Sequence, residues 1–355
     1  MNDSAVQGDL GGGGRALLIA ASLIIVIAGL QAAKSLILPF LLAMFLAMVT
    51  LPLLNWMQDK KVPTGVAVLL TLILALSIVV GLGVMIGGSV AQIGDEIPKY
   101  RERLEEISGG AIAQLEKIGL PVSQEAFQDL VNPDRVWEYA QAGLRGIATA
   151  LSNMFLVLLT IVFVLFEAAG IPAKLQKAFG DRRNSERYEK IKSEIQQYLR
   201  AKTVISLATG TCIGIGLWIV GVDFAFLWAS LAFVLNYIPN LGSIIAAVPP
   251  VLLTLVQLGP VQALVVAILF VAVNVVFGNV IEPYLVGRKV GLSTLVVFLS
   301  LVFWGWVWGP VGMLLSVPLT MIVKIMLENT EDLRWIAILL GPAPAKEKNP
   351  KKASA

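Results

Sequence analysis

The chain has 355 residues, of which 57% are hydrophobic and only 14% are charged, with a formal net charge of +3 at pH 7. A soluble domain carries roughly 25% charged residues, so this chain lacks the polar surface that a water-soluble fold needs. It contains no histidine and one cysteine, which excludes His-based catalytic triads, zinc sites with His ligands and an intrachain disulfide. The small net charge gives no reason to expect nucleic acid as a partner.

Long apolar blocks separated by charged stretches predict an all-α polytopic membrane protein. A spanning helix needs about 20 apolar residues, and the ~10-residue alternating segments of a transmembrane β-barrel do not occur. We expect roughly eight to ten apolar segments, forming about six full spans and two interrupted or re-entrant helical hairpins. The predicted segments are 16–54 (two helices that turn at Lys34), 62–91, 147–169, 203–221, 224–238, 241–258, 261–281, 292–308 and 310–327.

Charged residues divide the chain into units and predict its orientation. Segment 92–145 has 6 Lys/Arg against 10 Asp/Glu, whereas segment 170–202 has 9 against 4. The positive-inside rule then places 92–145 outside the cytoplasm, and 170–202 and both termini inside it. The predicted units are a tail at 1–15, a three-span unit at 16–91, an amphipathic helical segment at 92–145, a fourth span at 146–169, a basic helical segment at 170–202, a transport core with two hairpins at 203–327, and a tail at 328–355.

An apolar stripe at helical spacing marks the start of the outer segment. Its spacing of four and three residues predicts an amphipathic helix, which either forms a lid or partner-binding helix, or packs on the membrane surface or on a neighbouring subunit. The stripe consists of Ile93, Ile97, Tyr100, Leu104 and Ile107.

The two predicted hairpins are interrupted by helix-breaking residues. Pro239-Asn240 joins 224–238 to 241–258, and Gly309-Pro310 joins 292–308 to 310–327. Each arm is shorter than a full span, and backbone groups freed at that depth survive only if they are buried in protein or line a cavity. Matching interrupted segments are the best sequence pointer to a transport site. Ten ordinary crossings, with each hairpin spanning fully, remain the alternative.

The interrupted regions also resemble each other. Gly242–Pro249 and Gly312–Pro318 both run from glycine through an aliphatic stretch to a small residue, valine and proline, and each hairpin follows an ordinary span. If each hairpin leaves on the side it entered, the first opens outside and the second inside. The pattern therefore predicts an inverted repeat with substrate near the bilayer midplane.

Polar and glycine residues at the breaks are the candidate substrate-binding set. Their amides, hydroxyl and free backbone groups either hydrogen-bond a polyhydroxylated solute or satisfy the broken backbone themselves. The set consists of Asn236, Pro239, Asn240, Gly242, Ser243, Gly309, Pro310 and Gly312.

Ionisable residues next to long apolar blocks are candidates for coupling or charge pairing. Glu282 ends an apolar block and either pairs with Arg288, binds a coupling cation, or forms an ion pair at headgroup level. Asp223 stands alone between two blocks, as a ligand or as an exposed turn residue or helix cap.

Several motifs resemble those of the autoinducer-2 exporter (AI-2E) family of bacterial membrane proteins. They cover Leu235–Ser243, Glu282–Arg288, Gly291–Ser293 and Gly309–Pro318. Many family members carry Leu-His-Pro where this chain has Leu-Ser-Thr at 292–294, so a proton-relay role for that histidine does not transfer.

The resemblance implies an inner-membrane secondary transporter or facilitator that exports a small polar solute, autoinducer-2, without a cofactor or enzymatic activity. A sodium (cation)/proton antiporter and a non-transporting membrane scaffold are the alternatives. The lipid bilayer and the solute are the expected partners, while Na⁺ or H⁺ coupling and homo-oligomerisation stay open. No metal site is expected.

Overall fold

The computed structural model describes residues 12–117, 159–164, 167, 174, 177, 182–286, 291–328, 330 and 333–342. Every regular element in these ranges is helical, which confirms the predicted all-α class. Most of the predicted fourth span, 146–169, lies outside the described residues. So do residues 118–145, most of 170–181, Arg288 and the end of the tail.

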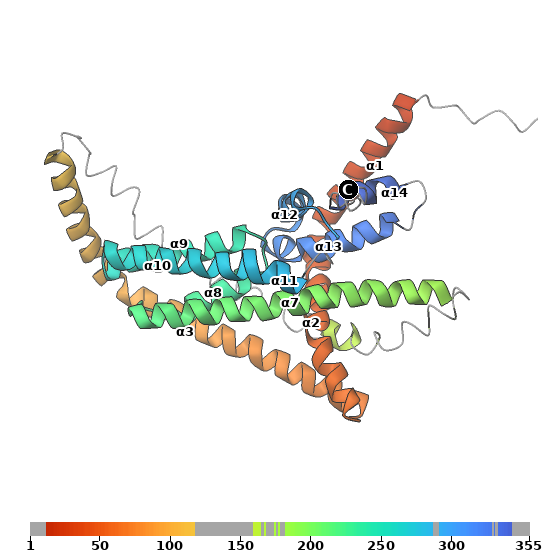
Figure 1. The fold of residues 1–355 in the computed structure, drawn as a ribbon, viewed down its shortest axis with the longest axis horizontal. Helices are drawn as coiled ribbons and strands as arrows, with labels where there is room; N and C mark the ends of the chain where they lie inside the picture. The colour runs from red at the N-terminus through yellow and green to blue at the C-terminus, as the bar shows by residue number, and fades with distance from the viewer. Residues whose placement is uncertain are drawn as a thin grey trace, which may run out of the picture.

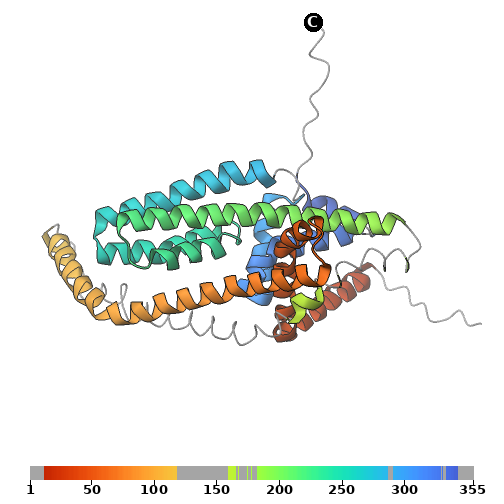
Figure 2. The ribbon, with the colours of Figure 1, turned by 90° about the horizontal axis from the view of Figure 1, so that it is seen from below.

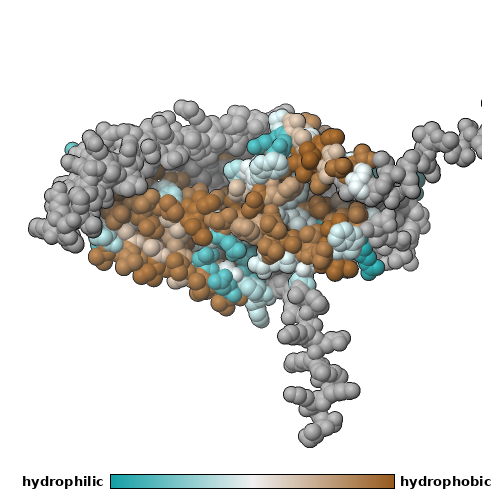
Figure 3. Space-filling model, turned by 90° about the horizontal axis from the view of Figure 1, so that it is seen from above, coloured by the Kyte–Doolittle hydropathy of each residue, from teal (hydrophilic) through white to brown (hydrophobic). Residues whose placement is uncertain are grey.

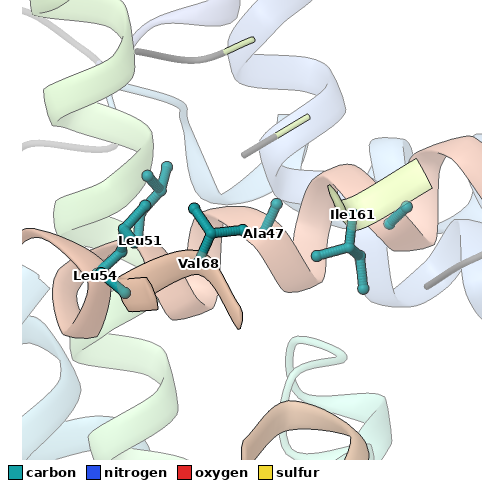
Figure 4. Close-up of a cluster of buried hydrophobic side chains, with 7 residues drawn as sticks. Ala47, Leu51, Leu54, Val68 and Ile161 are labelled. Carbon is teal, nitrogen blue, oxygen red and sulfur yellow. The ribbon is translucent and has the colours of Figure 1, made fainter. Parts of the chain in front are cut away.

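Two helices precede a long third one. The first two are α1 (Gly12–Ala32) and α2 (Lys34–Asp59), and the third is α3 (Thr64–Lys117), all shown in Figure 1. The chain turns at Ala33, next to the predicted Lys34. Small side chains on α2 let α3 approach closely, and Figure 4 shows Ala47, Leu51 and Leu54 of α2 beside Val68 of α3 and Ile161.

Helices α3 and α7 each run across a boundary that the charge pattern had suggested. We expected a span at 62–91 and a separate outer helix, but α3 continues through 54 residues. It bends toward its C-terminal end in Figure 1, where Pro98 lies inside the helix; an internal proline removes a backbone hydrogen bond and bends a helix. Helix α7 (Arg182–Val220) likewise joins the basic segment to the span after residue 202.

The remaining helices form two groups around α7. The first is α8 (Ala225–Leu235), α9 (Leu241–Gln257), α10 (Pro260–Asn274), the π-helix η1 (Val275–Ile281) and α11 (Glu282–Val286); the second is α12 (Thr294–Trp308), α13 (Pro310–Glu328) and α14 (Arg334–Leu340). In Figures 1 and 2, α8, α9 and α10 run alongside α7, whereas α12, α13, α14 and α1 gather at its other half. Helix α2 crosses α7 between the two groups.

Glycines bring α7 and α8 into close contact. A Cβ on Gly210 would lie 2.9 Å from the Ala229 carbonyl oxygen, and one on Gly214 would lie 2.8 Å from Ala229 Cβ. This Gly-x-x-x-Gly spacing is the small-residue pattern that packs membrane helices tightly. The contact fixes the part of α7 that faces the tip of the first hairpin.

The outer surface of the bundle is apolar. Figure 3 shows hydrophobic side chains over most of the described part of one face, interrupted by small polar patches. Among the described residues, 4 helical stretches are long and apolar enough to cross a membrane: Lys34–Asp59, Ser193–Val220, Pro260–Leu285 and Pro310–Glu328. Shorter apolar helices include both arms of the first hairpin. The chain is therefore a multi-pass helical membrane protein.

The segment after residue 328, which we expected to be a tail, contains a further helix. Helix α14 packs back onto α13, and Ala337 is 1% exposed. Its end is tied to the start of α12, because the Ser293 backbone N–H donates to the Leu340 carbonyl.

Candidate functional site

A buried ion pair lies inside the apolar bundle, between α7 and the start of α11. Lys202 Nζ is 2.8 Å from both carboxylate oxygens of Glu282. The Lys202 side chain is 3% exposed and that of Glu282 is 26% exposed. Both residues belong to helical stretches long and apolar enough to span a membrane. Charges in that setting are expensive and mark a functional site by default.

The π-helix η1 sets the direction of Glu282. A wider turn admits an extra residue, which rotates the following side chains by roughly 100° relative to an α-helix. Pro283 follows Glu282 and cannot donate to the preceding turn, so the widened ladder also accommodates the proline. Short π-helical stretches are frequent at functional sites. In this chain η1 ends where Glu282 meets Lys202.

The first hairpin (α8–α9) brings its tip, Asn236–Asn240, onto the same turn of α7. Asn236 Nδ2 donates to Ser206 Oγ at 3.0 Å, and Tyr237 Oη donates to Thr203 Oγ1 at 2.8 Å. Both tip side chains are buried. Buried amides and hydroxyls must be hydrogen-bonded to avoid a large desolvation cost, so the tip is held to α7 by polar contacts.

These contacts join the ion pair to the hairpin tip. One turn of α7 carries Lys202, Thr203 and Ser206, and the Thr203 hydroxyl itself donates to the Leu199 carbonyl at 2.7 Å. We call the group the α7 polar cluster. Its members are Lys202, Thr203, Ser206, Asn236, Tyr237 and Glu282.

The backbone of the first tip turns too tightly for most residues. Asn240 has φ of 59° and ψ of −50°, and the Leu241 backbone N–H donates to the Pro239 carbonyl at 2.6 Å, which is the geometry of a rare and strained γ-turn. A Cβ on Gly242 would lie 2.7 Å from the Leu235 carbonyl carbon and closer still to its oxygen. Asn240 is exposed and Ser243 half-buried, so of the polar residues predicted here only Asn236 enters the α7 polar cluster.

The second hairpin (α12–α13) has a similar close contact between its arms, although Gly309 alone links them where the first hairpin has Asn236–Asn240. A Cβ on Gly312 would lie 2.7 Å from the Trp304 carbonyl carbon, the same distance as at Gly242. Its tip is fastened elsewhere, because Trp308 Nε1 donates to the Leu30 carbonyl of α1 at 3.1 Å.

The two tips do not meet at one pocket. Lys34 Nζ lies 3.5 Å from the place of a Cβ on Gly309, whereas the Phe45 ring packs edge-on against Tyr237 of the first tip. Lys34 and Phe45 are separated by eleven residues of α2, or about 16 Å. A small apolar cavity lies between α2, α7 and α13, lined by residues that include Phe45 and Leu199; it offers a polar solute no hydrogen bonds.

Asp223 lies at the other end of α7, about 27 Å from Lys202 along the helix. Its carboxylate accepts a 2.8 Å hydrogen bond from Tyr100 Oη of α3, and its backbone N–H donates to Gln257 Oε1 of α9. The pKa of Tyr100 is raised mainly because the side chain is buried, and secondly because it is hydrogen-bonded to the Asp223 carboxylate. Asp223 therefore fastens α3 to the first hairpin. The other predicted partner of Glu282, Arg288, lies outside the described residues.

A model of the AI-2E family transporters matches residues 20–332. The chain belongs to the AI-2E transporter family. It is 40% identical over 322 residues to the AI-2 transport protein TqsA of Escherichia coli K12, covering 90% of this chain and 93% of that protein.

Two further relatives are similar along nearly the whole chain. The putative transport protein YhhT of Escherichia coli K12 is 37% identical, and the alignment covers 94% of this chain and 96% of that protein. A putative transport protein of Haemophilus influenzae is 38% identical, with 92% of this chain and 96% of that protein covered. This AI-2E family member is accordingly a membrane transporter, as the motifs at both hairpins had predicted.

Four members of the α7 polar cluster were not predicted from the sequence: Lys202, Thr203, Ser206 and Tyr237. Lys202 ended a run of basic residues and so looked like part of a cytoplasmic segment. A usable signal was present, because Lys202, Ser206 and Thr209 recur at spacings of four and three, which places them on one helical face. Among the described residues, no group of three or more His, Cys, Asp or Glu side chains is arranged to hold a metal ion.

Proposed function

We propose that this protein exports a small polyhydroxylated solute of the autoinducer-2 type across the bacterial inner membrane, with both termini in the cytoplasm. Membership of the AI-2E transporter family supports transport as the activity. The name of its 40% identical relative, AI-2 transport protein TqsA, supports the choice of solute.

The observation that carries the proposal is the α7 polar cluster. It gathers an ammonium, a carboxylate, an amide and hydroxyls around one turn of α7, within helices that are otherwise apolar. Buried polar groups cost stability unless they are paired, and a buried ion pair is itself weak support for a fold. A polar site for cargo explains why these groups are kept in the bundle.

The chemistry of the cluster suits a neutral solute with several hydroxyls. Lys202 has three N–H donors and Glu282 has acceptor oxygens, so the pair offers both kinds of hydrogen bond while remaining neutral overall. Asn236 adds an amide that both donates and accepts. A passing diol or triol can exchange hydrogen bonds with these groups one at a time, which avoids leaving either charge unpaired.

Cation/proton antiport is the second candidate, and Glu282 is the observation that favours it. A carboxylate inside the bundle can release and bind a proton. Its present partner is the Lys202 ammonium at 2.8 Å, so a bound Na⁺ would have to displace that ammonium from both carboxylate oxygens.

Efflux from proteoliposomes tests the proposal. Vesicles loaded with autoinducer-2 should release it when they contain wild-type protein, and Lys202→Met or Glu282→Gln should reduce the rate at least tenfold. Lys99→Met is the matched control, because Lys99 is exposed and its ion pair is with Glu96 on the same helix. Wild-type vesicles that retain autoinducer-2 but exchange sodium for protons, with loss in Glu282→Gln, would replace export by antiport.

A further inference from the structure

Two polar side chains of α7 are buried without a hydrogen-bond partner among the described residues. They are Gln196, at its Nε2 atom, and Thr209, at its hydroxyl. Gln196 is 8% exposed and Thr209 is 5% exposed. Leaving a buried donor unpaired costs about 1–3 kcal/mol, so each such group in a folded protein needs an explanation.

Thr209 differs from other threonines in the helices of this protein. The hydroxyls of Thr50, Thr71, Thr203 and Thr254 each donate to the carbonyl four residues earlier, at 2.6–2.9 Å. That local bond is the usual way for a helical threonine in an apolar setting to satisfy its hydroxyl. Thr209 does not use it, which leaves the hydroxyl free to bind something else.

The two side chains bracket the α7 polar cluster. Gln196 lies six residues before Lys202, and Thr209 lies three residues after Ser206, on the buried side of the same helix. From Gln196 to Thr209 the helix rises about 20 Å, against a hydrocarbon core about 30 Å thick. At about 100° per residue the two side chains point about 140° apart, so the polar groups run obliquely across the buried half of α7 through much of the depth of a bilayer.

The neighbouring helix is widened at the level of Thr209. Lys202 faces Glu282, and Gly216 faces Leu269 in the antiparallel pair of α7 and α10. Between these two contacts the register places Thr209 at the level of Asn274, where α10 gives way to the π-helix η1. A π-helical turn opens the backbone ladder, so an additional polar site is available in this part of the bundle.

We infer that Gln196 and Thr209 are two further hydrogen-bonding positions for the same class of solute, a small polyhydroxylated molecule, one on each side of the Lys202–Glu282 pair. This inference rests on the proposed function. It makes the site a track along α7 in which the solute keeps its hydrogen bonds as it moves, instead of a single binding point.

Two substitutions that preserve volume test the inference. Thr209→Val and Gln196→Met remove the unpaired polar groups and keep the packing. We expect each to raise the autoinducer-2 concentration for half-maximal efflux by about 3- to 10-fold, the effect of one neutral hydrogen bond. The melting temperature of the purified protein should stay the same or rise, because an unpaired buried group is removed.

Thr254→Val is the matched control, since Thr254 is also buried but its hydroxyl is already bonded to the Pro250 carbonyl. It should lower the melting temperature and leave the efflux concentration dependence unchanged. Wild-type concentration dependence in both test variants would overturn the inference, as would a loss of stability like that of Thr254→Val. If the wild type itself does not release autoinducer-2, the proposed function fails instead, whatever the variants do.

Discussion

The hairpins α8–α9 and α12–α13 share one close contact between their arms but have different linking turns and different surroundings. In both, a glycine of the second arm packs against a carbonyl of the first arm, with a Cβ position 2.7 Å from the carbonyl carbon. The first tip is bonded to hydroxyls of α7 beside a buried ion pair, whereas the second is fastened to α1 through a tryptophan. One backbone device thus serves a polar site in one place and helix packing in the other.

The close contact between glycine and carbonyl that both hairpins share gives the largest expected effect on stability. Gly242→Ala or Gly312→Ala would force a methyl group into the Leu235 or Trp304 carbonyl, and overpacking against backbone should cost about 3 kcal/mol or more. Size-exclusion profiles and melting temperatures in detergent measure the loss.

Gly65→Ala is the control for the glycine variants, because no heavy atom lies within 4 Å of a Cβ there. It should be neutral or stabilising by up to about 1 kcal/mol. Well-folded Gly242→Ala and Gly312→Ala proteins would contradict the close approach in both hairpins.

The Lys202–Glu282 ion pair, which lies beside the first hairpin, gives the next largest expected effect on stability. Lys202→Met leaves the Glu282 carboxylate unpaired, and because that side chain is 26% exposed and can be partly hydrated, the unfolding free energy should fall by about 1.5–3 kcal/mol. Lys202→Met combined with Glu282→Gln should recover much of that loss, which a double-mutant cycle on thermal stability would detect. A loss in the double variant equal to the sum of the two single losses would show that the two side chains do not interact.

The two tips should also differ in what a lost hydrogen bond does. Asn236→Leu should slow autoinducer-2 efflux at least about tenfold per folded molecule, because the amide belongs to the α7 polar cluster. Trp308→Phe removes the bond to Leu30 and should cost about 1–2 kcal/mol of stability with an unchanged efflux rate per folded molecule. Slower efflux in both variants would remove the functional distinction between the tips.

The smallest effect is expected at the Tyr100–Asp223 contact, far from both tips. Tyr100→Phe should cost about 1 kcal/mol. The pKa of Tyr100 is raised above its ordinary value of 10.0, so above that pH the unfolded chain loses a proton that the folded protein keeps, and stability falls as pH rises. A shallower fall in Tyr100→Phe, followed by thermal melting from pH 9 to 11, would confirm the sign; an unchanged slope would contradict it.

The sequence predicted local features well because their causes are local. Proline and glycine at Pro239 and Gly309 fixed both breaks, and Glu282 stood out against its apolar block. The pairing of Lys202 with Glu282 joins residues eighty positions apart, and no short-range pattern specifies it. The basic run that ends at Lys202 marks a change of composition along one continuous helix, α7, which runs on to Val220 packed against the first hairpin and α10.

Solute protection of single cysteines tests the difference between the tips most directly. The native Cys212 is the only cysteine, so Cys212→Ser gives a background in which Ser243→Cys marks the first tip and Pro310→Cys the second. Autoinducer-2 should slow the reaction of Ser243→Cys with a water-soluble thiol reagent severalfold and leave that of Pro310→Cys unchanged. Equal protection of both positions, or protection of Pro310→Cys alone, would contradict the assignment of the solute site to the first hairpin.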